Sequence, residues 1–379
     1  MNSLPCSCLS GIRLLPALLL LITSGIQAQY FQRQLGTSFD NTFTRVFQDG
    51  SHYYVLGQDQ PGNGATPHAT VTRMDANGVH LWTLSLDIPS AWNDAVLTPT
   101  GDLLVVGNTL PADATNQSLM GLVTPSGGGG FTWVRSYDVP GREANIKIIK
   151  NPAPQNASFP YYVVGGQFDP SGSNALWDDI FLLNINAAGN FNWKKKFPST
   201  ADDEFGRDLE VLPNGNMLLS GNLGSAGVIV EVTNAGAIVS GATPTGLSFT
   251  YADVVQSSGG GYYAVGNTFP SITNYLMKYD QNLIGQWEAN ISSLSTVRSV
   301  WEDSSTGDLF VTGDWNVGGA TRTVVLNIKV IANAPVLQWV RYLDNGEFSY
   351  ATGYTSLLPS GVLAYADGRV PSINGFGSV

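Results

Sequence analysis

The stretch SSGGGYYAVGNTFP, Ser257–Pro270, decides the fold of this 379-residue chain. It joins a glycine-rich turn to a strand of aromatic and β-branched residues, which ends in Gly266 and a small polar residue. The pattern recurs as YYVLGQ at Gly57, LLVVGN at Gly107, YVVGGQ at Gly166, MLLSGN at Gly221, YYAVGN at Gly266, LFVTGD at Gly313 and a degenerate LAYAD at Ala366. Seven copies at a spacing of about 50 residues indicate one repeated structural unit.

Three further strand patterns accompany the glycine strand in each of the first six units. One precedes it, as in DAVLTP from Asp94, and two follow it. The last one usually carries a tryptophan: Trp82, Trp133, Trp193, Trp287 and Trp339, with AIVSG near Ile238 in the fourth unit. Four short strands in a repeat of this length are typical of a propeller blade. We therefore predict an all-β fold, a seven-bladed β-propeller of four-stranded antiparallel blades.

The seventh unit is one strand short. It offers candidate strands at Tyr354–Leu358 and Val362–Ala366 and the segment INGFGSV, and the sequence then stops at Val379. The N-terminal segment YFQRQLG, Tyr30–Gly36, matches the register of the tryptophan strands, so we predict that it closes the last blade. The alternative, a series of β-sandwich domains, would call for linkers between modules, and the sequence shows none.

Composition agrees with a β fold. Charged residues make up 12% of the chain, about half of the ordinary share, which leaves few of the Glu, Lys and Arg that cover helix surfaces. The net charge of −11 repels nucleic acid and anionic lipid, so we expect a protein or glycan ligand as partner, no nucleic acid, and a monomer.

The first 28 residues have the features of a secretory signal peptide. Arg13 precedes the apolar run Leu14–Ile22, and small residues lead to a cleavage site near Ala28. We predict one domain over residues 29–379 in a secreted, periplasmic or cell-surface location, without membrane insertion, because no later apolar run is long enough. Cys6 and Cys8 both lie in the signal, so the mature chain would have no disulfide and no thiolate metal site.

Two kinds of motif carry a resemblance to a known group of proteins. SSGGGYYAVGNTFP and its partner TPTGDLLVVGNTLP, Thr98–Pro111, alternate with DANGVHLW at Asp75–Trp82 and NAAGNFNW at Asn186–Trp193. Together they resemble the repeats of secreted β-propellers of Bacteroidota. The resemblance covers nearly the whole chain after the signal, but it rests on turn and core residues. It implies the propeller fold and export, and no activity.

Acidic and aromatic residues recur near the start of the first strand of several units. Counting 13 residues back from the glycine gives Asp94, Asp208 and Asp253, with Thr44 at the same place in the first unit. If the first strands line a central channel, these residues gather at one mouth of it. Aromatic rings stack on sugars, and carboxylates accept hydroxyl protons or hold calcium. The candidate ligand-binding residues are Trp92, Asp94, Phe205, Asp208, Tyr251 and Asp253.

The same residues have an alternative structural role. Asp and aromatic residues at the start of a strand commonly cap turns and seal contacts between blades. The sequence has no HExxH, Walker, GxSxG or EF-hand motif, and catalytic residues stay unassigned. Our first hypothesis is a secreted non-enzymatic binding or scaffold module. The alternative is a carbohydrate-active enzyme, of the glycoside hydrolase or polysaccharide lyase type, that uses the channel-mouth carboxylates. We expect no cofactor other than calcium.

Overall fold

A computed structural model describes residues 41–60, 65–110, 116–137, 142–168, 179–198, 204–223, 226–242, 249–268, 272–317 and 320–342, with four pairs at 350–351, 356–357, 363–364 and 367–368. The chain divides into Met1–Phe31 and Gln32–Val379, and all described residues belong to the second unit. Every regular element among them is a strand. These residues contain no helix with the length and hydropathy to cross a bilayer. The predicted signal peptide and the predicted closing strand, Tyr30–Gly36, lie outside the described residues.

Six sets of four consecutive antiparallel strands account for most of the described residues. The first set comprises β1 (Asn41–Asp49), β2 (His52–Asp59), β3 (His68–Asp75) and the first part of β4 (His80–Leu97). The second comprises the rest of β4, β5 (Leu103–Thr109), β6 (Ser118–Thr124) and β7 (Gly130–Tyr137). The third comprises β8 (Arg142–Lys150), β9 (Tyr161–Phe168), β10 (Asp179–Ile185) and β11 (Phe191–Pro198).

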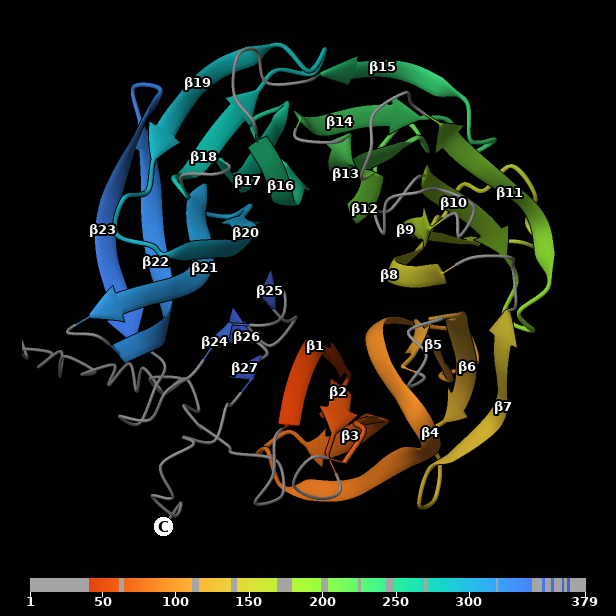
Figure 1. The fold of residues 1–379 in the computed structure, drawn as a ribbon. Coiled ribbons are helices and arrows are strands. Elements are labelled where there is room, and N and C mark those ends of the chain that lie inside the picture. Colours follow the sequence, from red (N-terminus) through yellow and green to blue (C-terminus); the bar gives the residue numbers. More distant parts are fainter. Residues whose placement is uncertain are drawn as a thin grey trace, which may run out of the picture. The chain divides into compact units, whose positions relative to one another are not determined.

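The remaining sets repeat this order. The fourth comprises β12 (Glu204–Val211), β13 (Met217–Leu223), β14 (Ala226–Val232) and β15 (Ile238–Ala242). The fifth comprises β16 (Phe249–Gln256), β17 (Tyr262–Thr268), β18 (Asn274–Tyr279) and β19 (Gly285–Asn290). The sixth comprises β20 (Thr296–Asp303), β21 (Asp308–Val317), β22 (Ala320–Ile331) and β23 (Ala334–Tyr342). Within Gln32–Val379 the sets follow one another around a common centre, with their first strands innermost (Figure 1).

Strand β4 serves two sets. Its residues up to Pro89 pair with β3, and those from Ser90 pair with β5, so the first two sets share one continuous sheet. Short strands extend that sheet beyond β1: β27 (Asp367–Gly368) pairs with β1, and β24 (Tyr350–Ala351) pairs with β27. A separate pair, β25 (Ser356–Leu357) and β26 (Leu363–Ala364), falls on the two candidate strands of the seventh unit.

The core lies between consecutive sets. Each of five apolar clusters draws its buried residues from two neighbouring sets. In β5, Leu103 and Val105 face the first set while Leu104 and Val106 face the third, because successive side chains of a strand point to opposite faces. Sheets that are apolar on both faces leave little surface for charged residues, which explains the low charged fraction.

The recurrent glycine of the second strand is required by the innermost strand beside it. Each innermost strand carries a β-bulge, and a Cβ on the facing glycine would collide with a backbone carbonyl oxygen just before that bulge, that of Ala91 for Gly107. In the third set the glycine in this position is Gly165, facing the Ala144 carbonyl, so the sequence assignment to Gly166 was wrong by one residue. The GG pair in YVVGGQ offers two glycines, and the polar residue Gln167 after the second one favoured Gly166.

The recurrent tryptophan packs against a turn of the next set. Three rings lie where a Cβ would stand on the glycine of that turn: Trp82 against Gly129, Trp133 against Gly189, and Trp193 against Gly236. All three glycines have positive φ. Their lack of a side chain therefore serves both the turn and the packing of the ring.

The fourth and fifth sets depart from this pattern together. Strand pairing places Ser240, not Ile238, at the tryptophan position of the fourth set. The turn residue facing that position in the fifth set is Leu283, which has φ 61° and is 4% exposed. Leu283 belongs to the apolar cluster between the two sets, so its side chain occupies the interface from which the ring is missing.

Candidate functional site

The residue that follows the bulge is equivalent in all six innermost strands. Strand pairing gives the series Arg45, Asp94, Lys147, Asp208, Asp253 and Ser299. The sequence prediction found the three aspartates but placed Thr44 in the first set, where the equivalent residue is Arg45. Thr44 is the bulge residue, and its hydroxyl donates to the Trp92 carbonyl at 2.7 Å.

The charged members of this series connect neighbouring sets. Arg45 Nε lies 3.1 Å from Asp94 Oδ1, and Lys147 Nζ lies 2.6 Å from Asp208 Oδ1. The other oxygen of Asp94 accepts a hydrogen bond from the Ile148 backbone amide in the third set at 3.0 Å. Ion pairs and backbone hydrogen bonds thus run from one innermost strand to the next.

Asp208 and Asp253 form a hydrogen-bonded carboxyl pair. Burial raises the pKa of Asp253, and the neighbouring Asp208 carboxylate raises that pKa further. Burial is the largest influence on Asp208 and acts to raise its pKa, but the Lys147 ammonium, together with hydrogen bonds from Asp253 and the Leu209 backbone, holds that pKa below its usual value. These opposite directions favour a shared proton on Asp253 over one on Asp208. Asp253 Oδ2 also accepts from the Val300 backbone amide at 2.9 Å.

The three predicted aromatic residues are all buried, and two of them lie in different interfaces between sets. Trp92 is fully buried in the cluster between the first two sets, and Tyr251 is fully buried between the fourth and fifth, where its hydroxyl contacts that of Tyr279. Phe205 is also buried, with the Arg207 guanidinium 4.6 Å from its ring centre. These positions correspond to the alternative, structural role. The ligand-binding role of the six candidate residues stays a prediction.

Sequence reasoning missed three groups of this inner series. The distance from this position to the recurrent glycine of the second strand is not 13 residues in the first, third and sixth sets, because the loop after the innermost strand changes length. The residues missed for this reason are Arg45, Lys147 and Ser299. It also missed Glu210 on β12, which accepts from the Gln256 backbone amide at 3.0 Å. Burial and the nearby Asp208 carboxylate raise the pKa of Glu210 to about 7. In the described ranges, no group of three or more His, Cys, Asp or Glu side chains is placed to hold a metal ion.

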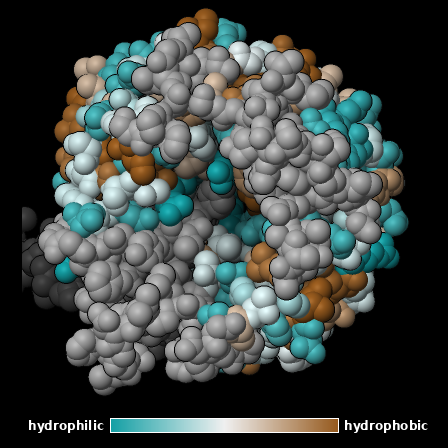
Figure 2. Space-filling model, in the orientation of Figure 1, coloured by the Kyte–Doolittle hydropathy of each residue, from teal (hydrophilic) through white to brown (hydrophobic). Residues whose placement is uncertain are grey.

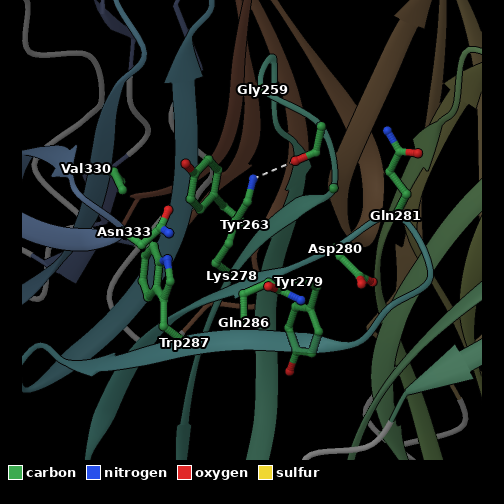
Figure 3. Close-up of a pocket in the computed structure, with 12 residues that line it drawn as sticks. Gly259, Tyr263, Lys278, Tyr279, Asp280, Gln281, Gln286, Trp287, Val330 and Asn333 are labelled. Carbon is green, nitrogen blue, oxygen red and sulfur yellow. Dashed lines mark hydrogen bonds between the residues drawn. The ribbon is translucent and has the colours of Figure 1, made fainter.

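A cleft opens between the fifth and sixth sets. It has a volume of about 350 Å³, and Tyr263, Lys278 and Trp287 line it together with Asn333 of the β22–β23 turn (Figure 3). Lys278 Nζ donates to the Gly260 carbonyl at 2.8 Å and lies 3.9 Å from the centre of the Tyr263 ring. Burial lowers the pKa of Lys278 to about 8.

An equivalent cleft of about 250 Å³ lies between the first two sets. Tyr54 and Arg73 line it, and they pair across β2 and β3 as Tyr263 and Lys278 pair across β17 and β18. Arg73 Nη1 donates to the Pro125 carbonyl of the next set at 2.9 Å. Around the central hollow, the described residues are mostly hydrophilic or intermediate, and hydrophobic patches lie elsewhere on the face seen in Figure 2.

Comparison with known proteins gives a fold and no family. No protein-family model and no curated protein matches the sequence. Among solved structures, the Dos1 propeller shares 13% identity over 86% of this chain and 78% of its own, with a TM-score of 0.53. A functionally unknown protein of Desulfotomaculum acetoxidans shares 13% identity over 84% of this chain and 90% of its own, with a TM-score of 0.53. Sqt1 of Chaetomium thermophilum shares 11% identity over 83% of this chain and 75% of its own, with a TM-score of 0.52. These likenesses, with the six four-stranded sets, show that the chain has a β-propeller fold.

Proposed function

We propose that the chain is a secreted, non-enzymatic β-propeller that acts as a binding or scaffold module for a glycan or protein ligand. One observation carries this proposal. Four charged groups of the inner series, Asp94, Lys147, Asp208 and Asp253, are buried, and Lys147 and Asp253 both engage Asp208. Groups in this arrangement stabilise the contact between sets, whereas a general acid or base must reach its substrate.

The proposed molecule has seven blades and is closed by its N-terminal strand. Six sets supply six blades, and the short strands β24 to β27 supply part of the seventh. Gly78 supports closure: it is buried, has φ 72°, and stands at the turn position that receives a tryptophan ring from the preceding set elsewhere. In the proposed ring, Phe31 of the N-terminal strand is the residue in register with those tryptophans.

Export is part of the same proposal. The signal-like first 28 residues and the resemblance to secreted Bacteroidota propellers support it, and we propose a secreted, periplasmic or cell-surface location. Expression with a Bacteroidota host's export machinery should yield a mature chain that begins at Gln29. Mass spectrometry of the intact protein from the medium and cell fractions tests this. An N-terminus at Met1 in the cytoplasm would contradict it.

A binding screen tests the function itself. The purified mature chain should bind oligosaccharides on a glycan array or proteins captured from the host envelope, with binding titrated against calcium and against a chelator. We propose no required cofactor, with calcium as the one candidate, so binding that a chelator abolishes and added calcium restores would assign calcium to the site. Turnover of a polysaccharide, with no stable binding of any ligand, would contradict the non-enzymatic role.

The second candidate function is a carbohydrate-active enzyme. One observation favours it: the pKa of Asp253 is raised and that of the neighbouring Asp208 is lowered, and carboxyl groups whose pKa values are pushed apart can serve as acid and base. This function requires a polysaccharide to reach the two carboxyl groups, which are buried, and it predicts that Asp253→Asn abolishes polysaccharide turnover while the protein stays folded. The binding-module proposal predicts no turnover in either protein.

A further inference from the structure

The repeat is broken at two contacts between the described sets. At the contact between the fourth and fifth sets Leu283 fills the interface, whereas the contact between the fifth and sixth sets departs in a different way. At three other contacts a positive-φ glycine of the next set lies against the tryptophan ring. The hairpin that faces Trp287 is different, since β22 and β23 stay paired up to Ile331 and Ala334 and turn through Ala332 and Asn333. Trp287 consequently borders the 350 Å³ cleft, together with Val330 and Asn333. A departure from the repeat that leaves a cleft beside the tryptophan ring marks this contact as a candidate site.

The chemistry around this cleft combines aromatic rings with neutral amides, one ammonium group and the Asp280 carboxylate, whose Oδ1 accepts from the Asn282 and Ile284 backbone amides. Trp287 and Tyr263 supply the rings, Gln286 and Asn333 supply the amides, and Lys278 supplies the ammonium group. Figure 3 shows Tyr263, Lys278, Trp287 and Asn333 around the same space. Lys278 is held in position by its hydrogen bond to the Gly260 carbonyl and by its place over the Tyr263 ring. Its ammonium group has two further N–H groups to donate.

We propose that this cleft binds a carbohydrate, with a pyranose ring on Trp287 and its hydroxyl groups hydrogen-bonded to Lys278, Gln286 and Asn333. An amide both donates and accepts, as a sugar hydroxyl does, and an aromatic ring packs against the C–H groups of the sugar. The volume is at the lower end of the range for small-ligand sites, which suits one or two sugar rings. The inference rests on the proposed binding function and assigns its glycan ligand to one cleft.

The equivalent cleft between the first two sets provides the matched control. Arg73 takes the place of Lys278 there, but it is bonded to Pro125 of the next set. Trp82, which takes the place of Trp287, lies against Gly129 and is 8% exposed. A sugar cannot stack on a ring that the neighbouring turn covers, so this cleft should not bind the carbohydrate.

Isothermal titration of the purified exported chain with array-selected oligosaccharides, neutral and uronic acid-containing, tests the proposal. Lys278→Met and Asn333→Gly should each weaken binding at least tenfold, because each removes hydrogen-bond donors, and Gly tolerates the positive φ of residue 333. Arg73→Met should bind like the parent. Melting temperatures of all variants verify that they are folded, and Lys278→Arg should restore part of the lost affinity.

Three results would overturn the inference, and they separate it from the proposed function. Oligosaccharide binding that survives both Lys278→Met and Asn333→Gly would place the glycan site elsewhere and leave the binding function intact. Binding of a protein ligand but of no oligosaccharide would reject the carbohydrate and also leave the binding function intact. Polysaccharide turnover without stable binding would reject both.

Discussion

Position 147 of the third set shows what a single residue contributes to this fold. Lys147 is buried between two neighbours of opposite charge, Asp94 and Asp208, and the Asp208 carboxylate keeps the pKa of Lys147 high although burial acts to lower it. Without Lys147, Asp208 would be a buried charge beside a second carboxyl group. The lysine therefore offsets the free-energy cost of burying the Asp208 carboxylate beside Asp253.

We predict that Lys147→Met lowers the free energy of unfolding by about 3–5 kcal/mol, the usual cost of removing one partner of a buried ion pair. Urea denaturation followed by tryptophan fluorescence measures it. The double variant Lys147→Met with Asp208→Asn should recover part of the loss, because the uncompensated charge is gone. Equal loss in the single and double variants would show that shape, not charge, matters at this position.

A second residue-scale prediction concerns Glu210. Its pKa is raised from 4.5 to about 7, so between these values the folded protein holds a proton that the unfolded chain releases. Stability from this group is therefore greatest at low pH and is lost as pH rises towards 7 and above. We expect the free energy of unfolding to fall by roughly 2 kcal/mol from pH 5 to pH 7.5 through Glu210, given about 1.4 kcal/mol for each pKa unit.

The variant Glu210→Gln should flatten that pH dependence. Asp253, with its raised pKa, acts in the same direction as Glu210, and Asp208, with its lowered pKa, acts in the opposite one. Only the difference between parent and variant reports on Glu210. Denaturation curves of both proteins at several pH values supply it, and parallel pH profiles would contradict the prediction.

At the scale of elements, the turns between third and fourth strands are fitted to the rings of the preceding set. Gly189→Ala introduces a Cβ 2.8 Å from the Trp133 ring in a turn with φ 75°. We expect it to lower the free energy of unfolding by roughly 2–4 kcal/mol, the sum of backbone strain and overpacking. Gly50→Ala is the matched control, since it has φ 55° but open space around its Cβ, and it should cost only about 1 kcal/mol.

Chemical denaturation of the two glycine variants distinguishes these contributions. Equal losses at Gly50 and Gly189 would mean that the turn alone requires glycine. The pair Ser240 and Leu283 supports a packing role, because the tryptophan and the glycine are replaced together at that contact. The sequence contained this signal, but the two positions become neighbours only when the fourth and fifth sets pack against each other.

At the scale of the whole molecule, the proposed N-terminal closure predicts a cooperative loss. Deletion of Tyr30–Gly36 leaves a sheet edge unpaired and the seventh blade incomplete, so we expect a melting temperature lower by more than about 5 °C. Differential scanning calorimetry of the mature chain, with and without these residues, measures it. A deletion of equal length within Asn151–Pro160 is not a suitable control. Asn151 Nδ2 donates to the Gly215 carbonyl, so losing that hydrogen bond would itself change the melting temperature. An unchanged melting curve after the N-terminal deletion would contradict closure by this segment.

The sequence by itself determined the repeated four-stranded unit, because strand periodicity and turn glycines are local properties of a chain. It also placed Asp94, Asp208 and Asp253 in one register, since the loop after their strands has the same length. Only the tertiary structure decided that Arg45 and Lys147 share this register and that Asp208 pairs with Lys147 and Asp253. Those contacts join residues of different sets, and they depend on loop lengths and on how one sheet packs against the next. Likewise, only the packing of the β22–β23 hairpin of the sixth set showed that Trp287, unlike Trp82, borders an open cleft.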